Sequence, residues 1–245
     1  MAKQITPALD ENARRYYLDV MGIQCWESLD KHAEKLDDIQ TNKDVAFDQS
    51  VTDDLSWSQI DTAIQRCDHC SLHKTRKQAI AGQGSRSAEL LFILLSPEAG
   101  DESANMLAAE ANELFAKMLS AINIYIDDVY ISSLLKCAVP AQHTVTPHEI
   151  QQCENYLRQQ IQLMQPKLVV VLGETAIRCL LQKELSLDDF RGQINTGVQI
   201  NKMAEYEFES VPLFVSYSPQ ELLRQPENKR KAWSDLQQLQ KIIEI

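Results

Sequence analysis

The chain has 245 residues, of which 44% are hydrophobic and 24% charged, and its formal net charge is −11 at pH 7. This negative charge excludes nucleic-acid binding that depends on electrostatic attraction between the whole protein and the phosphates, although it is compatible with a local basic patch. No apolar run approaches the ~20 residues of a membrane span and no secretory signal opens the sequence, so the six cysteines indicate a reducing cytoplasm and metal ligation rather than disulfides.

Residues 13–27 are the first stretch rich in large apolar side chains, and Gly22 is typical of a helix that ends just after Met21. Two interpretations are open: a terminal helix packed on its own domain, or a short linear motif that docks on a partner with Trp26 as its anchor. Residues 27–54 favour the motif. They hold nine acidic residues against three lysines, a net charge of −6, so we expect an extended or partly helical tether.

A folded body is expected from residue 55 onward, and it opens with an amphipathic helix over Trp57–Arg66. This helix leads into Cys67 and Cys70. The basic stretch His73–Lys77 follows, and it is either an ordinary solvated face or a local contact for DNA phosphates.

Strand-like and helix-like stretches alternate along the rest of the body. Continuous apolar runs predict strands buried on both faces, and apolar residues every three or four positions predict helices. The expected strands are residues 89–95, 129–135, 166–172 and 211–216, and the expected helices are residues 104–122, 146–164, 174–182, 219–224 and 228–243, with 185–210 irregular or β. The alternation predicts an α/β fold, an open and mostly parallel sheet with helices on both faces, whose ligand site lies at the carboxyl ends of the first, second and fourth strands.

Four of the six cysteines are distributed over three of these elements. Cys67 and Cys70 form a C-x-x-C pair, and Cys137 follows the second strand. Cys153 lies one turn into the helix whose start is marked by the capping sequence Thr146-Pro-His-Glu149. Four soft ligands from separate elements fit an iron–sulfur cluster or a zinc ion, and they are also compatible with unpaired core thiols.

An ordered series of motifs in residues 67–241 resembles the iron–sulfur uracil-DNA glycosylases of families 4 and 5. The series comprises Cys67-x-x-Cys70, Lys136-Cys137, Cys153-x-x-Tyr156, Pro166-Lys-Leu-Val-Val-Val-Leu-Gly173, Arg191-Gly192 and Tyr217-x-Pro219-x-x-Leu222-Leu223-Arg224. The resemblance implies a glycosylase-like fold with a [4Fe-4S] cluster, structural or redox-active, and zinc is the alternative. The implied ligands are Cys67, Cys70, Cys137 and Cys153. Cys179 matches no ligand position and is expected to be a buried helix thiol.

The loops that carry the chemistry in that family differ in this chain. Glu98 is displaced from the place of the family's acid, in a loop that begins at Ser96. Ser133 stands where an asparagine reads the base, and Ser218 stands where a histidine donates to the uracil oxygen. From these changes we expect a degenerate former active site with no catalytic residue, because the loss of one such electrostatic donor costs ~10²–10³ in rate.

A second resemblance concerns the segment Arg14–Trp26, which is similar to the N-terminal motif of the psi subunit of the bacterial DNA polymerase III clamp loader. In psi this segment binds the collar of the clamp-loader tau/gamma subunits, and the globular domain binds the chi subunit, which contacts single-stranded-DNA-binding protein. The familiar psi subunit is shorter and lacks the four cysteines, so this chain would be a longer form. The partner contacts implied here are Arg14, Arg15, Tyr17, Leu18, Met21, Ile23 and Trp26.

The interpretation we favour from the sequence is a non-catalytic psi-type subunit in the bacterial cytoplasm, nucleoid-associated during replication, with DNA contacted indirectly and no membrane contact. It would have a docking segment (1–27), an acidic linker (28–54) and a glycosylase-like domain (55–245). Two alternatives are open: a divergent uracil-DNA glycosylase of base-excision repair that acts through Glu98 or another acid, and a DNA-damage sensor that binds through His73–Lys77 and Arg224–Lys231.

Overall fold

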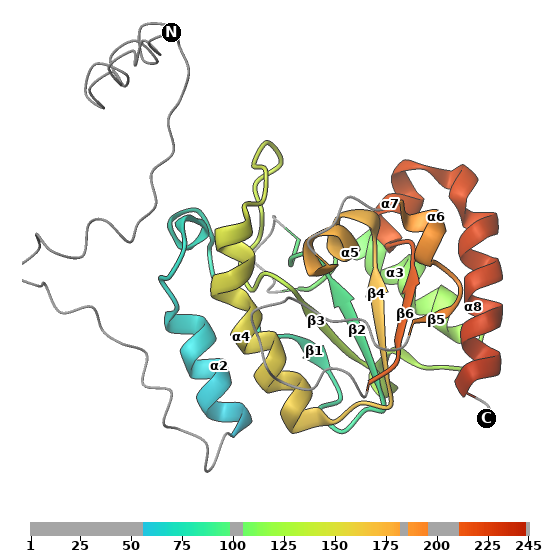
Figure 1. The fold of residues 1–245 in the computed structure, drawn as a ribbon, viewed down its shortest axis with the longest axis horizontal. Coiled ribbons are helices and arrows are strands. Elements are labelled where there is room, and N and C mark those ends of the chain that lie inside the picture. Colours follow the sequence, from blue (N-terminus) through green and yellow to red (C-terminus); the bar gives the residue numbers. More distant parts are fainter. Residues whose placement is uncertain (1–55, 99–104, 182–185, 196–210, 244–245) are drawn as a thin grey trace, which may run out of the picture. The chain divides into compact units, whose positions relative to one another are not determined.

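The structure, a computed structural model, describes residues 56–98, 105–181, 186–195 and 211–243 (Figure 1). Val51–Ile245 forms one compact unit. The docking segment and the acidic linker expected within residues 1–54 lie outside the described residues. So do the seven expected partner contacts, which are Arg14, Arg15, Tyr17, Leu18, Met21, Ile23 and Trp26. None of the described helices has the length and apolar character needed to cross a membrane.

A six-stranded sheet lies at the centre of the compact unit, in the order β1-β3-β2-β4-β6-β5 (Figure 1). The four inner strands are parallel: β3 (Tyr130–Ser133), β2 (Leu90–Leu94), β4 (Leu168–Leu172) and β6 (Leu213–Ser216). The edge strands are short and antiparallel to their neighbours: β1 (Gln83–Gly84) pairs with β3, and β5 (Ile194–Asn195) pairs with β6. The expected open, mostly parallel sheet is therefore confirmed.

Helices cover both faces of the sheet, because successive side chains of each buried strand point to opposite sides. Leu91 and Ile93 of β2 belong to one core. That core includes buried residues of α2 (Trp57–Arg66), α4 (Pro147–Met164) and α5 (Glu174–Leu181). Phe92 faces the opposite core, where α3 (Ala109–Ser120) and α8 (Lys229–Ile243) contribute buried residues. The expected two-faced α/β arrangement is confirmed.

Side-chain caps set the starts of several helices. Thr146 caps α4 and forms a capping box with Glu149, and Pro147 occupies the first helical position, as the sequence predicts. Ser56 forms the same kind of box at α2, and Ser218 forms one at α7 (Pro219–Arg224). These local signals explain why α2, α4 and α7 begin within a residue of the expected positions.

Two expectations about elements were wrong. The third helix, α3, begins at Ala109 rather than at residue 104, and its N-cap Ala108 offers no side-chain hydrogen bond. Residues 185–210 were expected to be irregular or β, but a four-residue helix, α6 (Leu187–Phe190), follows Ser186, whose hydroxyl accepts from the Asp188 N–H. One helical turn is too short to show the 3.6-residue periodicity on which the prediction depended. Short 3₁₀ turns occur at η2 (Ser71–Lys74), η3 (Ile126–Asp128) and η5 (Pro226–Asn228).

Candidate functional site

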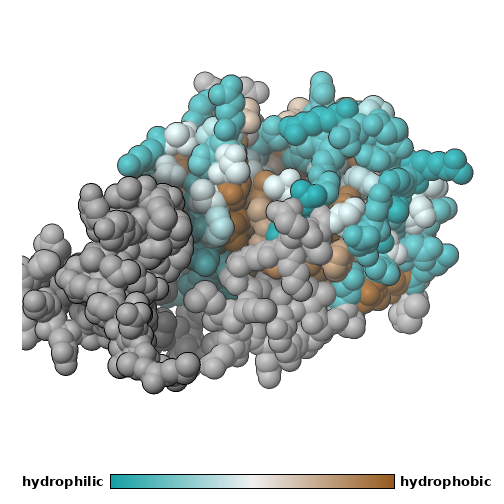
Figure 2. Space-filling view, turned by 45° about the horizontal axis from the view of Figure 1, so that its top comes forward, coloured by the Kyte–Doolittle hydropathy of each residue, from teal (hydrophilic) through white to brown (hydrophobic). Residues whose placement is uncertain are grey.

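The carboxyl ends of the four inner strands lie side by side. Leu94 at the end of β2 is in register with Ser133 at the end of β3, and Leu172 of β4 is in register with Ser216 of β6. When this edge is turned toward the viewer, apolar surface is visible between two hydrophilic regions (Figure 2). Open α/β sheets bind ligands at such an edge, so the strand ends form the candidate active site.

The loop after β2 brings the one acid that the sequence singled out to this edge. Ser96 and Glu98 are both partly exposed there. Within the described part of the chain, the Glu98 carboxylate has no hydrogen-bond or ion-pair partner. A carboxylate that the protein does not use for its own structure is available to water or to a ligand.

The end of β3 is fixed by a buried lysine. The Ser133 hydroxyl donates to the Leu135 carbonyl over 2.7 Å. The Lys136 ammonium donates to the Ser133 carbonyl, the Ser132 hydroxyl and the Gln160 side-chain oxygen, each over 2.8 Å. Burial lowers the pKa of Lys136 to about 7. The strand end is therefore held by its own hydrogen bonds, and the Ser133 side chain serves the backbone rather than a ligand.

Ser218, which follows the end of β6, also has a structural role. The Ser218 hydroxyl accepts from the Glu221 N–H as the N-cap of α7, and the Glu221 carboxylate accepts from the Ser218 N–H over 2.9 Å. Glu221 also accepts from the Glu174 N–H at the start of α5, over 2.9 Å. Gly173 lies between them at φ +105°, where a Cβ would come within 3.2 Å of the Glu221 carboxylate. The ends of β4 and β6 are thus tied together.

A buried ion pair holds the segment that leads from the end of β6 to Ser218. The Arg191 guanidinium donates to Asp235 of α8 over 2.7 and 3.2 Å, and the Ser216 hydroxyl donates to Asp235 over 2.8 Å. Arg191 also lies over the Tyr217 ring, 5.7 Å from its centroid. Burial raises the pKa of Asp235, against the lowering effect of Ser216 and Arg191. The pair connects α8, the segment after α6 and the residues that precede Ser218.

Removal of the acid from this pair should destabilise the protein. In Asp235→Ala the Arg191 guanidinium, 18% exposed, would lose its buried partner, at a cost of about 3 kcal/mol. We expect the melting temperature to fall by roughly 6–12 °C. Glu113→Ala is the matched control, because Glu113 pairs with Lys117 at the surface, away from Arg191, and is 68% exposed. Equal shifts in the two variants would contradict the assignment.

The four cysteines of the expected ligand set are all buried, and none forms a disulfide. Cys67 ends α2, Cys70 precedes η2, Cys137 follows β3 and Cys153 lies in α4. Burial raises the pKa of Cys70, Cys137 and Cys153, in Cys153 to about 12, and repulsion among the thiolates raises these pKa values further. Each of these three thiols therefore lies close enough to at least one other thiol of the set for their charges to interact.

An arginine that the sequence placed in a basic surface stretch turns inward to these thiols. The Arg76 guanidinium donates to the Cys137 sulfur over 2.9 Å and to the Cys67 carbonyl over 2.6 Å. A solvated face was one of the two interpretations for His73–Lys77, and for Arg76 it was wrong. No sequence signal distinguishes Arg76 from its neighbours. Cys179 of α5, expected to be buried, is only partly so.

The donor set has the chemistry of a soft metal centre. The three buried thiols with a raised pKa, Cys70, Cys137 and Cys153, stay protonated unless positive charge stabilises the thiolates, and one arginine supplies little of it. In the described ranges no three His, Cys, Asp or Glu side chains are arranged to hold a single metal ion. That finding concerns one ion, whereas a cluster holds its thiolates around a larger inorganic core. The thiols thus fit a group with several positive centres.

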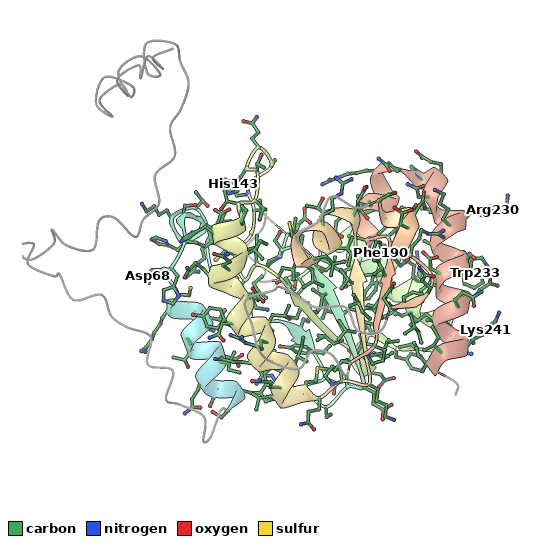
Figure 3. All side chains as sticks on the ribbon, viewed as in Figure 1. Asp68, His143, Phe190, Arg230, Trp233 and Lys241 are labelled. Atoms are coloured by element: carbon green, nitrogen blue, oxygen red, sulfur yellow. The ribbon has the colours of Figure 1, made fainter. Side chains whose placement is uncertain are left out.

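Glu149 connects the elements that carry three of these cysteines. Its carboxylate, 3% exposed, accepts from the Ser71 hydroxyl over 2.8 Å, from the Thr146 N–H over 2.9 Å and from the His143 ring over 3.0 Å. His143 lies in the loop above α4 (Figure 3). Burial raises the pKa of Glu149, but hydrogen bonds from His143, Thr146 and Ser71 together lower it to about 2. The sequence indicated only the capping role.

The lowered pKa makes this contribution to stability depend on pH. Because the folded-state pKa lies below the unfolded value near 4.3, up to about 3 kcal/mol is present above pH ~4.5 and is lost as the pH falls toward 2. We expect Glu149→Gln to melt below the wild type at pH 6, and this gap to shrink by about a third at pH ~3.5. Melting curves at the two pH values test this. A gap that does not narrow would contradict the role assigned to the carboxylate.

Comparison with known proteins gives a consistent result. Residues 81–237 match the family model described as the uracil DNA glycosylase superfamily. The type-4 uracil-DNA glycosylases of Pyrobaculum aerophilum and Archaeoglobus fulgidus are each 29% identical to this chain over 187 and 189 residues, which cover 74% and 75% of the chain and 92% of each relative. The type-4 enzyme of Thermotoga maritima is 30% identical over 131 residues, 53% of this chain and 68% of that protein.

These relatives contradict the function that we favoured from the sequence. A non-catalytic psi subunit of DNA polymerase III, with tau/gamma, chi and single-stranded-DNA-binding protein as partners, was the wrong interpretation, because the similarity extends over nearly the whole length of enzymes that act on uracil in DNA. The same relatives contradict the expectation that the chain has no catalytic residue. Its error was to infer loss of the whole reaction from changed residues in three loops, whereas the similarity to type-4 enzymes covers 92% of two of them.

Proposed function

The chain belongs to the uracil DNA glycosylase superfamily, and on that premise we propose that it is a DNA-repair enzyme that releases uracil from DNA. One observation carries the proposal: the similarity to type-4 uracil-DNA glycosylases covers 92% of two of them, and the matched residues include all four parallel strands. The alternative from the sequence, a glycosylase of base-excision repair acting in the cytoplasm, thus becomes the proposal.

The reaction is hydrolysis of the bond between N1 of uracil and C1′ of deoxyribose. Water attacks C1′ and releases a proton, and the bonding pair leaves with uracil, whose anion takes up a proton from solvent, so that uracil and the abasic sugar are the products. The target nucleotide must be turned out of the helix first. We assign Glu98 to orient the water and to stabilise the positive charge that develops on the sugar, because it is a partly exposed acid after β2 that has no hydrogen-bond or ion-pair partner among the described residues.

The ends of β3 and β6 supply a rigid frame for this chemistry. Ser133 and Ser218 hold their loops through their own hydroxyls, and the Lys136 and Glu221 side chains bond to the backbone beside them. A preformed frame of this kind positions the base and the water without reorganisation during the reaction. In this proposal neither serine hydroxyl contacts uracil.

A [4Fe-4S] cluster is the cofactor that we propose. Its ligands would be Cys67, Cys70, Cys137 and Cys153. Support comes from the four buried thiols, from the Arg76 guanidinium on the Cys137 sulfur and from the resemblance to iron–sulfur glycosylases. When bound, the cluster would supply covalent cross-links between α2, the end of β3 and α4. No catalytic step is assigned to it.

The test is release of uracil by the full chain. The protein, purified without oxygen, is incubated with a labelled oligonucleotide that carries one uracil, and alkali then cleaves any abasic site. We expect a cleaved product from the uracil strand and none from a matched thymine strand. If the protein retains its metal and remains folded, the absence of product on single- and double-stranded DNA would reject the proposal.

A further inference from the structure

The outward face of α8 carries an exposed tryptophan and two cations. Arg230, Trp233 and Lys241 project from this helix away from the body (Figure 3). Trp233 is 44% exposed. The three residues share one face with Ser234 and Gln237, because positions three, four, seven and eleven along a helix lie close together around its axis. All five are exposed.

This face is positively charged on an otherwise acidic chain. It holds no acidic residue, and the one acid of α8, Asp235, is buried in its pair with Arg191. Lys231, on another side of the helix, is paired with Asp188 over 2.8 Å. Within the described residues, Arg230 and Lys241 have no ion-pair partner and Trp233 stacks on no aromatic or cationic group. The chain as a whole has a net charge of −11, so a polyanion meets less repulsion at this face than the net charge implies.

The amino end of α8 lies on the side of the sheet that carries the candidate active site (Figure 1), and Asp235 of this helix accepts from the Ser216 hydroxyl at the end of β6. The helix begins at Lys229, directly after η5, which follows α7, and α7 begins at the end of β6. Arg230 and Trp233 lie in the first turns of α8, toward this end, and Lys241 lies toward the opposite end (Figure 3). From the helical rise, Lys241 is about 16 Å from Arg230 along the axis. The two cations of one face therefore differ in their distance from the site.

We propose that Arg230 and Trp233 form a second DNA contact, which holds an unpaired strand next to the target nucleotide. Arg230 binds a phosphate of that strand, and Trp233 stacks on a base. A cation and a neighbouring aromatic ring are the pair of groups with which proteins hold single strands without reading their sequence. The inference rests on the proposed function, since that function brings a DNA strand to the adjacent loops. It assigns to DNA binding a part of the stretch Arg224–Lys231.

Binding to a labelled 30-nucleotide single strand without uracil tests this contact independently of catalysis. Anisotropy titrations of the full chain at several salt concentrations would compare four variants with the wild type. We expect Trp233→Ala to weaken binding about tenfold with the same salt dependence, and Trp233→Phe to restore most of the affinity. Arg230→Gln should weaken binding and reduce the slope of log K against log salt by about one.

Lys241→Gln is the matched control, because it removes the same charge from the same face farther from the site. It should change affinity less than twofold. Equal losses in Arg230→Gln and Lys241→Gln, no loss in Trp233→Ala, or no binding of the strand by the wild type would each overturn the inference. Uracil release with unchanged strand binding in the variants would leave the proposed function standing and reject only this contact. Capture of an acidic protein by the same face, without DNA binding, would also reject it.

Discussion

Cys137→Ser should yield a protein without a stoichiometric cluster and with a much lower melting temperature. Cys137 follows β3, and its sulfur already accepts from Arg76. Without this ligand, the end of β3 would lose its covalent connection to α2 and α4, and structural metal sites of this kind contribute several kcal/mol or more to folding. We expect the melting temperature to fall by more than about 10 °C. Iron and acid-labile sulfide, assayed after anaerobic purification, report the cluster directly.

Cys179→Ser is the control for this experiment. Cys179 is another partly buried cysteine of the same unit, on α5, and it belongs to no proposed ligand set. It should keep full iron and sulfide and melt within a few degrees of the wild type. Zinc in place of iron in the anaerobic wild-type protein would refute the cluster while leaving the four thiols as ligands.

Glu98→Gln should lower the rate of uracil release by ~10²-fold or more, with little change in DNA binding. The neutral amide keeps the shape of the side chain but removes the negative charge that orients water and stabilises the sugar cation. Single-turnover kinetics on a uracil-containing oligonucleotide measure this step without product release. Glu89→Gln is the control, because Glu89 lies just before β2, at the other end of the same strand, and pairs with Lys167 at the surface. A variant of Glu98 that releases uracil at the wild-type rate would remove this residue from the mechanism.

Most of the fold could be predicted because its signals are local. The apolar runs of β2 and β4 are buried along their full length, and the capping box of Thr146 and Glu149 sets the start of α4. The burial of the four cysteines is seen in the structure, whereas their role as ligands, which the resemblance implied, stays a prediction. A single helical turn such as α6 has no such signal, since it depends on one N-cap serine.

The contacts that support the site could not be predicted, because their partners are distant in the sequence. Asp235 meets Arg191 across 44 residues, and Glu149 meets Ser71 across 78. Arg76 looks like any surface arginine until the fold places it on a cysteine sulfur. The function was misjudged for a different reason: a short motif at residues 14–26 and three changed loops were given more weight than a resemblance that extends over most of the chain.

The order of the cysteine-bearing elements along the chain also bears on how the protein is made. The last proposed ligand, Cys153, lies in α4, whereas β4 and β6, which complete the centre of the sheet, are encoded after it. A nascent chain therefore presents all four thiols before β4, one of the two strands that flank β2, has left the ribosome. Cluster delivery could precede closure of the sheet, and starvation for iron would then trap newly made chains at this open stage, where proteases act on them first.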